Sequence, residues 1–473
     1  MIELAVGQML ATRKGAIEAP AGTGKTEQIA LVAGTHPGRW LVLTHTVAGV
    51  DAIRKRLKKY AVPEAKAQVD TISAWSHRWA RAFPESSHLS SQWTAKENDW
   101  STVQRAAADL VESGAVHSVL TASYDGVLVD EYQDCAESQH RLICALSRMM
   151  RCYVFGDPLQ AIFGFTRTDR VVDWHTRTLP EFPLAGRLAT PHRWNAVDNG
   201  ELGAWLLSAR PGIQAGKIDL TNVPQSVEWM QCEAGQPVTD LGKFCFVRSQ
   251  QPGQTMAVLD SSFDAVRRAK LAKTIGGTTV EPVSGRCERD FYDSVRKTGG
   301  IERVAAVLDF ASSAFTGAAA ASKRKRVESL LANPGRQRIP ASPAEIALCA
   351  MARDTSFRHV FDALQCIEHE GGVTVTRPEL VYGIKASLRL CVENPGLSLE
   401  DATWQVANAR RERGRIVRNR SVGSTLLVKG LEFDHVVITP DACRTKLEWY
   451  VALTRATRSV RVLAPRQSFT VGS

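Results

Sequence analysis

The sequence has no pair of cysteines at the CxxC spacing that structural zinc sites and dithiol redox centres use. Its ten cysteines are scattered along the chain, so we expect reduced and mostly buried thiols rather than metal ligands. It also has no run of about 18 uncharged apolar residues, so we expect no membrane span. The first ten residues lack a basic stretch followed by a small-residue cleavage site. We therefore expect a cytoplasmic protein without a membrane partner.

Composition and charge are those of an ordinary globular protein that is moderately basic. Apolar residues make up 44% and charged residues 23% of the 473 residues, a length that predicts about three domains. The 59 basic and 49 acidic side chains leave a net charge of +10, which suits a nucleic-acid partner but also serves solubility. Basic runs at residues 323–326 and 409–420 either bind phosphate nonspecifically or form solvated helix faces.

The first part of the chain alternates apolar, strand-like runs with helical stretches, which is typical of a parallel α/β sheet. Ligands bind at the carboxyl ends of such strands, so functional side chains there should converge on one crevice. The candidate strands cover residues 16–19, 40–44, 126–129 and 152–156. A second unit of this kind is expected late in the chain, with strands at 423–428, 435–439 and 460–464 around a helix at 448–457.

A phosphate-binding loop is predicted at residues 19–26, Ala-Pro-Ala-Gly-Thr-Gly-Lys-Thr, between a strand and the helical run 27–33. Glycines let backbone N–H groups surround a phosphate, a lysine reaches the β- and γ-phosphates, and a threonine hydroxyl ligates Mg²⁺. The strict pattern has glycine where this chain has Ala19. The sequence therefore predicts ATP and Mg²⁺ as ligands, with these candidate contacts: Ala21, Gly22, Thr23, Gly24, Lys25 and Thr26.

Two acids follow the apolar run 127–129, where a buried strand is expected to end. Asp130 is placed to hold Mg²⁺ together with Thr26, and Glu131 to orient and deprotonate the attacking water. Carboxylates in the first turn of a helix are the alternative explanation. The phosphate-binding loop in the same chain favours the catalytic interpretation.

Seven segments, in the family's order, resemble the UvrD/Rep-type superfamily 1A DNA helicases. Two are the loop and the acids above. The others are Leu-Thr-His-Thr at 43–46, Asp-Thr-Ile-Ser at 70–73, Phe-Gly-Asp-Pro-Leu-Gln at 155–160, Lys-Gly-Leu-Glu-Phe-Asp at 429–434 and Tyr-Val-Ala-Leu-Thr-Arg-Ala at 450–456. The last two are the most specific. The resemblance implies an α/β fold of two RecA-like parallel-sheet domains with helical insertions, which clamp ATP between them.

The same resemblance implies a division of the chain into domains. Residues 1–190 would form the first RecA-like domain, with a short helical insertion at 88–116. The second would combine 191–272 with 407–473, and 273–406 would form a helical insertion of its own. The first insertion is shorter than is usual in the family, which implies a reduced grip on duplex DNA.

The resemblance also implies roles around the nucleotide. Gln160 would sense the γ-phosphate or the attacking water. Arg455, inside a predicted helix, occupies the place of the family's arginine finger, which neutralises charge on the transferred phosphoryl group. Arg193 matches a second γ-phosphate arginine less closely. Glu432 would face the ribose, and Gln8 either reads the adenine edge or is an ordinary surface glutamine.

A further set of residues matches the family's contacts with single-stranded DNA. Thr44, His45 and Thr71 would touch the backbone from strand ends. Phe163 and Phe165 stand where the family has tyrosine and tryptophan that stack on bases, an interaction that tolerates any sequence. Their alternative role is core packing. The family's histidine before residues 429–434 is missing here.

The function implied is an ATP-dependent single-stranded DNA translocase or helicase of 3'-to-5' polarity, stimulated by DNA. Compact members work beside nucleases, as in the Gabija anti-phage system. We therefore expect a protein partner such as an OLD-family nuclease, in phage defence or DNA repair. The alternative is a DNA-sensing ATPase that licenses a separate effector. RNA-directed activity fits the motifs less well.

Overall fold

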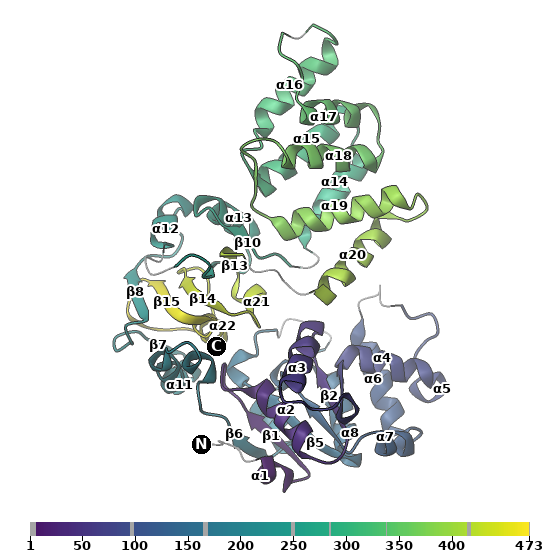
Figure 1. Ribbon diagram of the computed structural model, residues 1–473, viewed down its shortest axis with the longest axis vertical. Coiled ribbons are helices and arrows are strands. Elements are labelled where there is room, and N and C mark those ends of the chain that lie inside the picture. The colour runs from purple at the N-terminus through teal and green to yellow at the C-terminus, as the bar shows by residue number, and fades with distance from the viewer. Residues whose placement is uncertain are drawn as a thin grey trace. The chain divides into compact units, whose positions relative to one another are not determined.

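The computed structural model describes residues 6–94, 99–163, 169–246, 251–282, 285–336, 338–413 and 418–472 (Figure 1). The chain divides into two compact units. Unit 1 comprises Met1–Glu228, Arg444–Ser459 and Arg466–Ser473, and unit 2 comprises Trp229–Cys443 and Val460–Pro465. The boundaries expected for the individual domains stay a prediction.

Unit 1 contains a six-stranded sheet with the order β3-β2-β4-β5-β1-β6. Its strands are β1 (Lys14–Glu18), β2 (Trp40–Thr44), β3 (Ala67–Thr71), β4 (Gly126–Val129), β5 (Arg151–Gly156) and β6 (Leu184–Arg187). All neighbouring pairs are parallel. The carboxyl ends of the strands therefore meet at one edge, which confirms the expected parallel α/β sheet.

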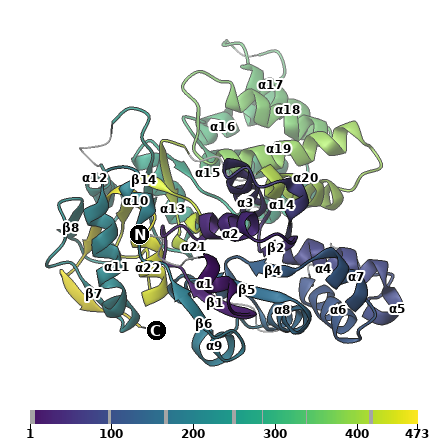
Figure 2. The ribbon, with the colours of Figure 1, turned by 60° about the horizontal axis from the view of Figure 1, so that its bottom comes forward.

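Strand side chains alternate between two apolar cores, one on each face of the sheet. Leu41 and Val127 belong to one core together with α4, α6 and α8. Val42 and Leu128, the next residues, belong to the other core with α1, α2 and α3 (Figure 2). Because helices cover both faces, the strands are continuous apolar runs rather than alternating ones.

The helices of unit 1 begin and end as follows: α1 (Val6–Leu10), α2 (Lys25–Thr35), α3 (Val47–Lys59), η1 (Glu64–Lys66), α4 (Ile72–Ala82), α5 (Pro84–Ser87), α6 (Trp100–Glu112), α7 (His117–Ser123), η3 (Tyr132–Asp134), α8 (Glu137–Met149), η4 (Pro158–Gln160), η5 (Trp174–Thr178), α9 (Leu179–Glu181), α10 (His192–Asn195), α11 (Gly200–Gln214) and α22 (Lys446–Leu453). A small antiparallel pair, β7 (Lys217–Asp219) with β16 (Ser468–Thr470), completes the unit.

The predicted insertion at 88–116 contains α6, and this helix is part of the main core. Ala107, Leu110 and Val111 of α6 are buried under the sheet. Its Val103 and Ala106 pack in a smaller cluster with Trp93. The apolar residues of this segment are therefore used to cover the sheet.

The second sheet has the order β10-β13-β9-β14-β15-β8. Its strands are β8 (Val227–Gln231), β9 (Met256–Leu259), β10 (Thr278–Thr279), β13 (Arg420–Gly423), β14 (Phe433–Ile438) and β15 (Ala456–Ala464). The pairs from β10 through β13 and β9 to β14 are parallel. The strand expected at 423–428 was wrong: the strand ends at Gly423, and α21 (Thr425–Val428) follows because the Ser424 hydroxyl caps it by accepting from Leu427 N–H.

Unit 2 also contains a helical region with its own core, drawn in green in Figure 1. The helices of the unit are α12 (Val238–Phe244), α13 (Ala265–Thr274), α14 (Arg286–Lys297), α15 (Gly300–Ala314), α16 (Ala320–Ala332), α17 (Pro343–Arg353), α18 (Phe357–Glu368), α19 (Pro378–Glu393) and α20 (Leu399–Arg413), with the hairpin β11 (Phe315–Thr316) and β12 (Thr374–Val375). None of the helices described in the chain is long and apolar enough to cross a membrane.

The basic run at 323–326 lies on α16, where carboxylates neutralise three of its four cations. Lys323 pairs with Glu370 at 2.6 Å, and Arg326 pairs with Glu345 at 3.8 Å. Arg324 pairs with a glutamate one turn further along the helix. This pairing favours a solvated helix face over a phosphate-binding patch.

Candidate active site

The loop at 19–26 joins β1 to α2 and requires glycine at two positions. Gly22 has φ 72° and Gly24 has φ 88°, in the left-handed region that other residues rarely adopt. Gly22 also lies against α10, because an added Cβ would be 2.6 Å from Trp194 Cζ3. The N–H of Arg193 donates to the Gly22 carbonyl at 3.1 Å. The loop is thus shaped by its own turn and by α10.

The start of α2 supplies backbone N–H donors to the site that this loop forms. Gly24 is the N-cap and has no side chain to satisfy the first N–H groups of the helix. Lys25 and Thr26 occupy the first turn. Thr23 is buried and its hydroxyl donates to the Pro20 carbonyl at 2.8 Å, which closes the loop. Unsatisfied N–H groups at a helix start form a site suited to a phosphate.

Lys25 meets both predicted acids at the end of β4. Its Nζ lies 3.3 Å from Asp130 Oδ1 and 2.5 Å from Glu131 Oε1. Burial alone would lower the pKa of Lys25, but the two carboxylates outweigh burial and raise it. Burial raises the pKa of Asp130 despite the opposing charge of Lys25. The structure thus brings together three residues that the sequence had placed in two separate motifs.

Glu131 is held in an unusual backbone conformation. Its φ is 55°, in the left-handed region, which costs a non-glycine residue about 1–3 kcal/mol and is common at active sites. Gln133 donates to Glu131 Oε2 at 2.5 Å and accepts the Asp157 N–H at 3.0 Å. Gln133 therefore ties the acids after β4 to the residues after β5.

Asp157, directly after β5, is fully buried and connects Gln160 to the loop. Its Oδ2 accepts from Gln160 Nε2 at 2.9 Å and from the backbone N–H of Ala21 at 3.1 Å. One carboxylate thus contacts both a predicted γ-phosphate sensor and the loop at 19–26. The Ala21 amide is engaged inside the protein, and a phosphate contact through this amide stays a prediction.

Two predicted arginines from distant segments lie in this same unit. Arg455 is 2% exposed, and its Nη2 donates to Gln160 Oε1 at 3.4 Å. Arg193 donates from Nη1 to the Thr454 carbonyl at 2.7 Å. Both arginines therefore belong to the cluster that contains Asp157 and the loop.

The helix expected at 448–457 was wrong at its C-terminal end. α22 stops at Leu453, and β15 begins at Ala456, so Arg455 lies in the turn between them. The Thr454 hydroxyl donates back to the Tyr450 carbonyl at 2.9 Å and closes the last turn of the helix. The direction of the Arg455 side chain is therefore set by the backbone of this turn and not by the face of a helix.

The candidate DNA contacts lie at the carboxyl ends of β2 and β3. Thr44 and Thr71 are partners in the sheet register. Thr71 also caps α4, and His45 Nε2 lies 3.6 Å from Cys135 Sγ. Phe163 is 47% exposed, which argues against core packing. Phe165 lies outside the described residues.

Gln8 and Glu432 keep roles that rest on the sequence alone. Gln8 is exposed on α1. Glu432 is exposed and belongs to unit 2.

Across the described part of the chain, no three histidine, cysteine, aspartate or glutamate side chains gather as a metal site. A Mg²⁺ ion at Thr26 and Asp130 would therefore need phosphate oxygens and water as its other ligands, as Mg²⁺ commonly does.

Arg210 and Tyr450 are among the residues of this cluster that were not assigned a role from the sequence. Arg210 contacts Asp157, and the Tyr450 hydroxyl contacts the loop. A single arginine in a helix carries no recognisable spacing, so only the structure reveals Arg210. Tyr450 was visible within the segment 450–456, but the pattern did not say what its hydroxyl touches.

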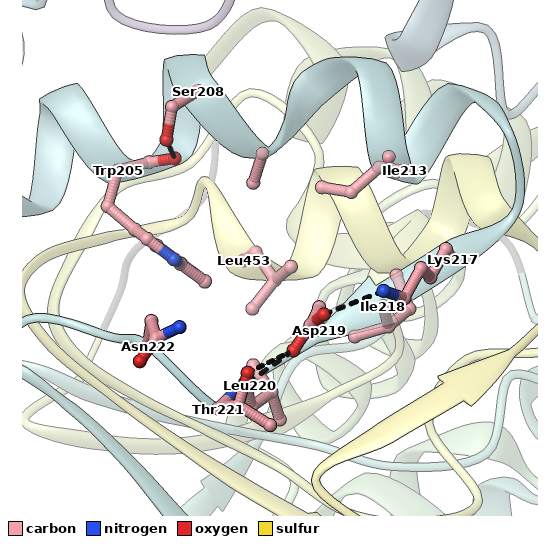
Figure 3. Close-up of a pocket in the computed structure, with 12 residues that line it drawn as sticks. Trp205, Ser208, Ile213, Lys217, Ile218, Asp219, Leu220, Thr221, Asn222 and Leu453 are labelled. Carbon is pink, nitrogen blue, oxygen red and sulfur yellow. Dashed lines mark hydrogen bonds and ion pairs between the residues drawn. The ribbon is translucent and has the colours of Figure 1, made fainter.

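A pocket of ≈ 310 Å³ lies between α11 and β7 (Figure 3). Trp205 and Ser208 of α11, Asn222 and Leu453 line it. The hydroxyl of Ser208 donates to the Trp205 carbonyl within the helix, so it is not directed at a ligand. The pocket contains none of the predicted site residues.

Comparison with known proteins gives one family match. Residues 94–171 match the UvrD/REP helicase N-terminal domain, a segment that includes Asp130, Glu131 and Gln160. An ATP-dependent helicase/nuclease subunit of Oenococcus oeni is 32% identical over 73 residues, 15% of this chain and 6% of the relative. The protein of the same name from Lactococcus lactis subsp. lactis is 31% identical over 72 residues, again 15% and 6%. The chain therefore spans a small part of these relatives.

Solved structures give more distant likenesses. The Pif1 helicase of Candida albicans aligns with 99% of this chain and 96% of its own, at 11% identity and a TM-score of 0.42. An arterivirus nonstructural protein 10 helicase, solved with DNA, aligns with 98% and 63%, at 10% identity and a TM-score of 0.36. Residues 94–171 of this chain are thus similar to the UvrD/REP helicase N-terminal domain.

Proposed function

We propose that this protein is an ATP-dependent motor that moves along single-stranded DNA. The observation that carries the proposal is the position of Lys25, 2.5 Å from Glu131 and 3.3 Å from Asp130, at the end of a glycine-containing loop. A loop of backbone donors, a lysine and two acids are the groups that phosphoryl transfer to water requires. The match of residues 94–171 to a helicase domain supports the same chemistry.

In the proposed reaction, the loop 22–26 binds the phosphates of ATP by its N–H groups and Lys25. The phosphate charge competes with Glu131 for Lys25, so binding frees the Glu131 carboxylate to orient and deprotonate the attacking water. Thr26 and Asp130 would hold Mg²⁺, which would supply neutralisation of the phosphate charge. In this proposal the Glu131 carboxylate becomes available to the attacking water only when ATP is bound.

Gln160 and two arginines complete the proposed site. Gln160 contacts the γ-phosphate or the water, and Arg455, its neighbour at 3.4 Å, stabilises the charge that develops during transfer. Arg193 would act as a second cation on the γ-phosphate. Gln8 and Glu432 are the proposed contacts to the adenine and the ribose.

The proposed strand path uses the ends of β2 and β3. Thr44, His45 and Thr71 would contact the DNA backbone, and Phe163 and Phe165 would stack on bases. The exposure of Phe163 supports a stacking role, since a base can stack only on an aromatic ring that is accessible from solvent. The polarity that we propose is 3'-to-5'.

We further propose that the protein unwinds duplex DNA weakly by itself and acts with a nuclease. The segment 88–116 is short, and α6 uses its apolar face to cover the sheet. Relatives named as helicase/nuclease subunits support a nuclease partner. An OLD-family nuclease, in phage defence or DNA repair in the cytoplasm, is the specific form of this proposal. A DNA-sensing ATPase that licenses a separate effector is the second candidate, favoured by the same use of α6 in the core.

The test is an ATPase and strand-displacement experiment on the purified chain. We expect single-stranded DNA to increase ATP turnover, and 3'-tailed duplexes to be unwound poorly at saturating ATP, beside 5'-tailed and blunt substrates. No turnover above that of Lys25→Ala would refute the motor. Robust unwinding of long 3'-tailed duplexes would instead refute dependence on a partner.

A further inference from the structure

Arg210 of α11 is the main counter-charge of Asp157. Its Nη2 donates to Asp157 Oδ1 at 2.9 Å and its Nη1 to Oδ2 at 3.1 Å, a two-pronged pairing. Nη2 also donates to Glu18 Oε1 at 3.1 Å, at the last residue of β1. The Arg210 side chain is 13% exposed and that of Asp157 is 0% exposed. Burial alone would lower the pKa of Arg210, but the charge of Asp157 raises it.

The Tyr450 hydroxyl extends this pairing to the loop. It accepts from Arg210 Nη1 at 2.5 Å and from the Ala21 N–H at 3.2 Å. The guanidinium lies 4.9 Å from the centre of the Tyr450 ring. Burial raises the pKa of Tyr450, so the hydroxyl stays protonated. Ala21 therefore contacts both the carboxylate and the hydroxyl that Arg210 holds.

The consequence concerns Gln160, which is bonded to the same Asp157 oxygen as Ala21. A buried carboxylate without its counter-charge is unfavourable and reorients or takes up a proton. Either change would move the acceptor that fixes the Gln160 amide. A displacement of about 1 Å at a catalytic group can cost about 10²-fold in rate.

We propose that Arg210 is a positioning residue of the ATPase site, acting through Asp157 on Gln160 and through Tyr450 on the loop. This inference rests on the proposed ATPase function. Arg210 is not expected to touch ATP, since both of its terminal nitrogens are engaged by Asp157, Glu18 and Tyr450. Its loss should therefore lower kcat for ATP more than it changes KM.

The experiment compares ATP turnover of the full chain carrying Arg210→Met, Arg210→Lys or Tyr450→Phe. We expect Arg210→Met to lower kcat by about 10- to 10²-fold, with KM within about threefold. Arg210→Lys should recover part of kcat, because a lysine restores the charge but not the two-pronged geometry. Tyr450→Phe, which removes only the hydroxyl, should lower kcat by about three- to tenfold.

The matched control is Arg187→Met. Arg187 pairs with the same Glu18 at 2.9 Å, but the Arg187 side chain is 68% exposed. The turnover of the Arg187→Met variant should therefore equal that of wild type. A double-mutant cycle then tests the route: in Gln160→Ala, the further loss of kcat caused by Arg210→Met should be no larger than that caused by Tyr450→Phe, because only the route through Tyr450 remains.

Three outcomes would overturn the inference: unchanged kcat in Arg210→Met, a change confined to KM, or additive effects with Gln160→Ala. Tyr450→Phe keeps the test informative if the arginine variants unfold, because a folded Tyr450→Phe with wild-type kcat also rejects it. If wild type shows no turnover above Lys25→Ala, the ATPase proposal itself has failed, and that result differs from each of the three.

Discussion

In each of the two parallel sheets, one strand is followed by a fully buried aspartate that pairs with an arginine from a helix. The two aspartates differ in the other hydrogen-bond donors that they contact. Asp157 follows β5 in unit 1 and pairs with Arg210. Asp260 follows β9 in unit 2 and accepts from Arg267 Nε of α13 at 2.9 Å. The sequence pattern of a strand followed by an acid is therefore not by itself the mark of a catalytic position.

The difference lies in the remaining donors. Asp157 also accepts from Gln160 and from the loop amide of Ala21, groups proposed to work on ATP. Asp260 instead accepts the Thr439 hydroxyl at 2.6 Å, at the end of the neighbouring β14. Unit 1 thus uses its buried ion pair to arrange a site, whereas unit 2 uses its pair to hold strands and a helix together. Variants should separate these two uses.

The largest effect should come from removing the cation of the unit 1 site. We expect Lys25→Ala to lower ATP turnover by at least about 10²-fold, because the phosphates lose their central charge contact. Steady-state ATPase assays measure it. The matched control is Lys14→Ala, which removes a 2.6 Å ion pair with Glu181 that is more than a third exposed. Equal turnover in the two variants would contradict the site.

Glu131→Gln should separate binding from chemistry at the same place. The amide cannot accept a proton from water, so we expect a loss of turnover of about 10²-fold or more while nucleotide still binds. Equilibrium binding of a fluorescent ATP analogue and turnover are measured together. Normal turnover would show that Glu131 is not the base.

The ion pair of unit 2 should show the opposite behaviour. Asp260→Ala leaves Arg267 with Asp441, 3.1 Å away, as its remaining carboxylate partner, and we expect the free energy of unfolding to fall by about 1–3 kcal/mol. Urea unfolding measures the loss, and turnover per folded molecule should be unchanged. Asp240→Ala is the control, because its pairing with Lys243 is half exposed and worth about 1 kcal/mol or less. A fall in turnover without loss of stability would remove the contrast between the sheets.

A smaller effect is expected at Phe163 and Phe165, the residues proposed to stack on DNA bases. Phe163→Ala should lose about 1–3 kcal/mol of base stacking and raise the DNA concentration for half-maximal ATPase stimulation, with basal turnover unchanged. Phe165→Ala should behave alike. Val119→Ala, at a similarly exposed apolar position, is the control. Identical half-maximal concentrations for all variants would mean that these rings do not contact DNA.

The smallest effect concerns cysteines, to which the proposed function gives no chemical role. Burial raises the pKa of Cys144 to about 12, and burial also raises those of Cys135 and Cys152. Since the thiolate is the reactive form, iodoacetamide at pH 8 should alkylate these three slowly in the folded protein. The half-buried Cys287 and Cys366 should react before them. Mass spectrometry of digests after timed labelling measures the order, and early labelling of Cys152 would contradict the buried sheet.

Local patterns predicted much of the fold. The strand that ends at Val129, the loop at 19–26 and the helix after it are consecutive in sequence, so apolar runs and glycines suffice to recognise them. Predictions failed where a local bond set the boundary. The Ser424 cap began a helix where a strand was expected, and the turn after Leu453 ended α22 early.

The sequence by itself determined which residues are candidates for phosphate chemistry: Lys25, Asp130 and Glu131 are recognisable because their motifs are short and the required spacing is local. Only the tertiary structure decided how they are held. Arg210 lies 53 residues from Asp157, and Tyr450 lies 429 residues from Ala21, yet both pairs are hydrogen-bonded. No spacing rule encodes such contacts, because they depend on how β1, β5, α11 and α22 pack. Burial then gives these contacts their importance, since an ion pair without water must find its partners within the protein.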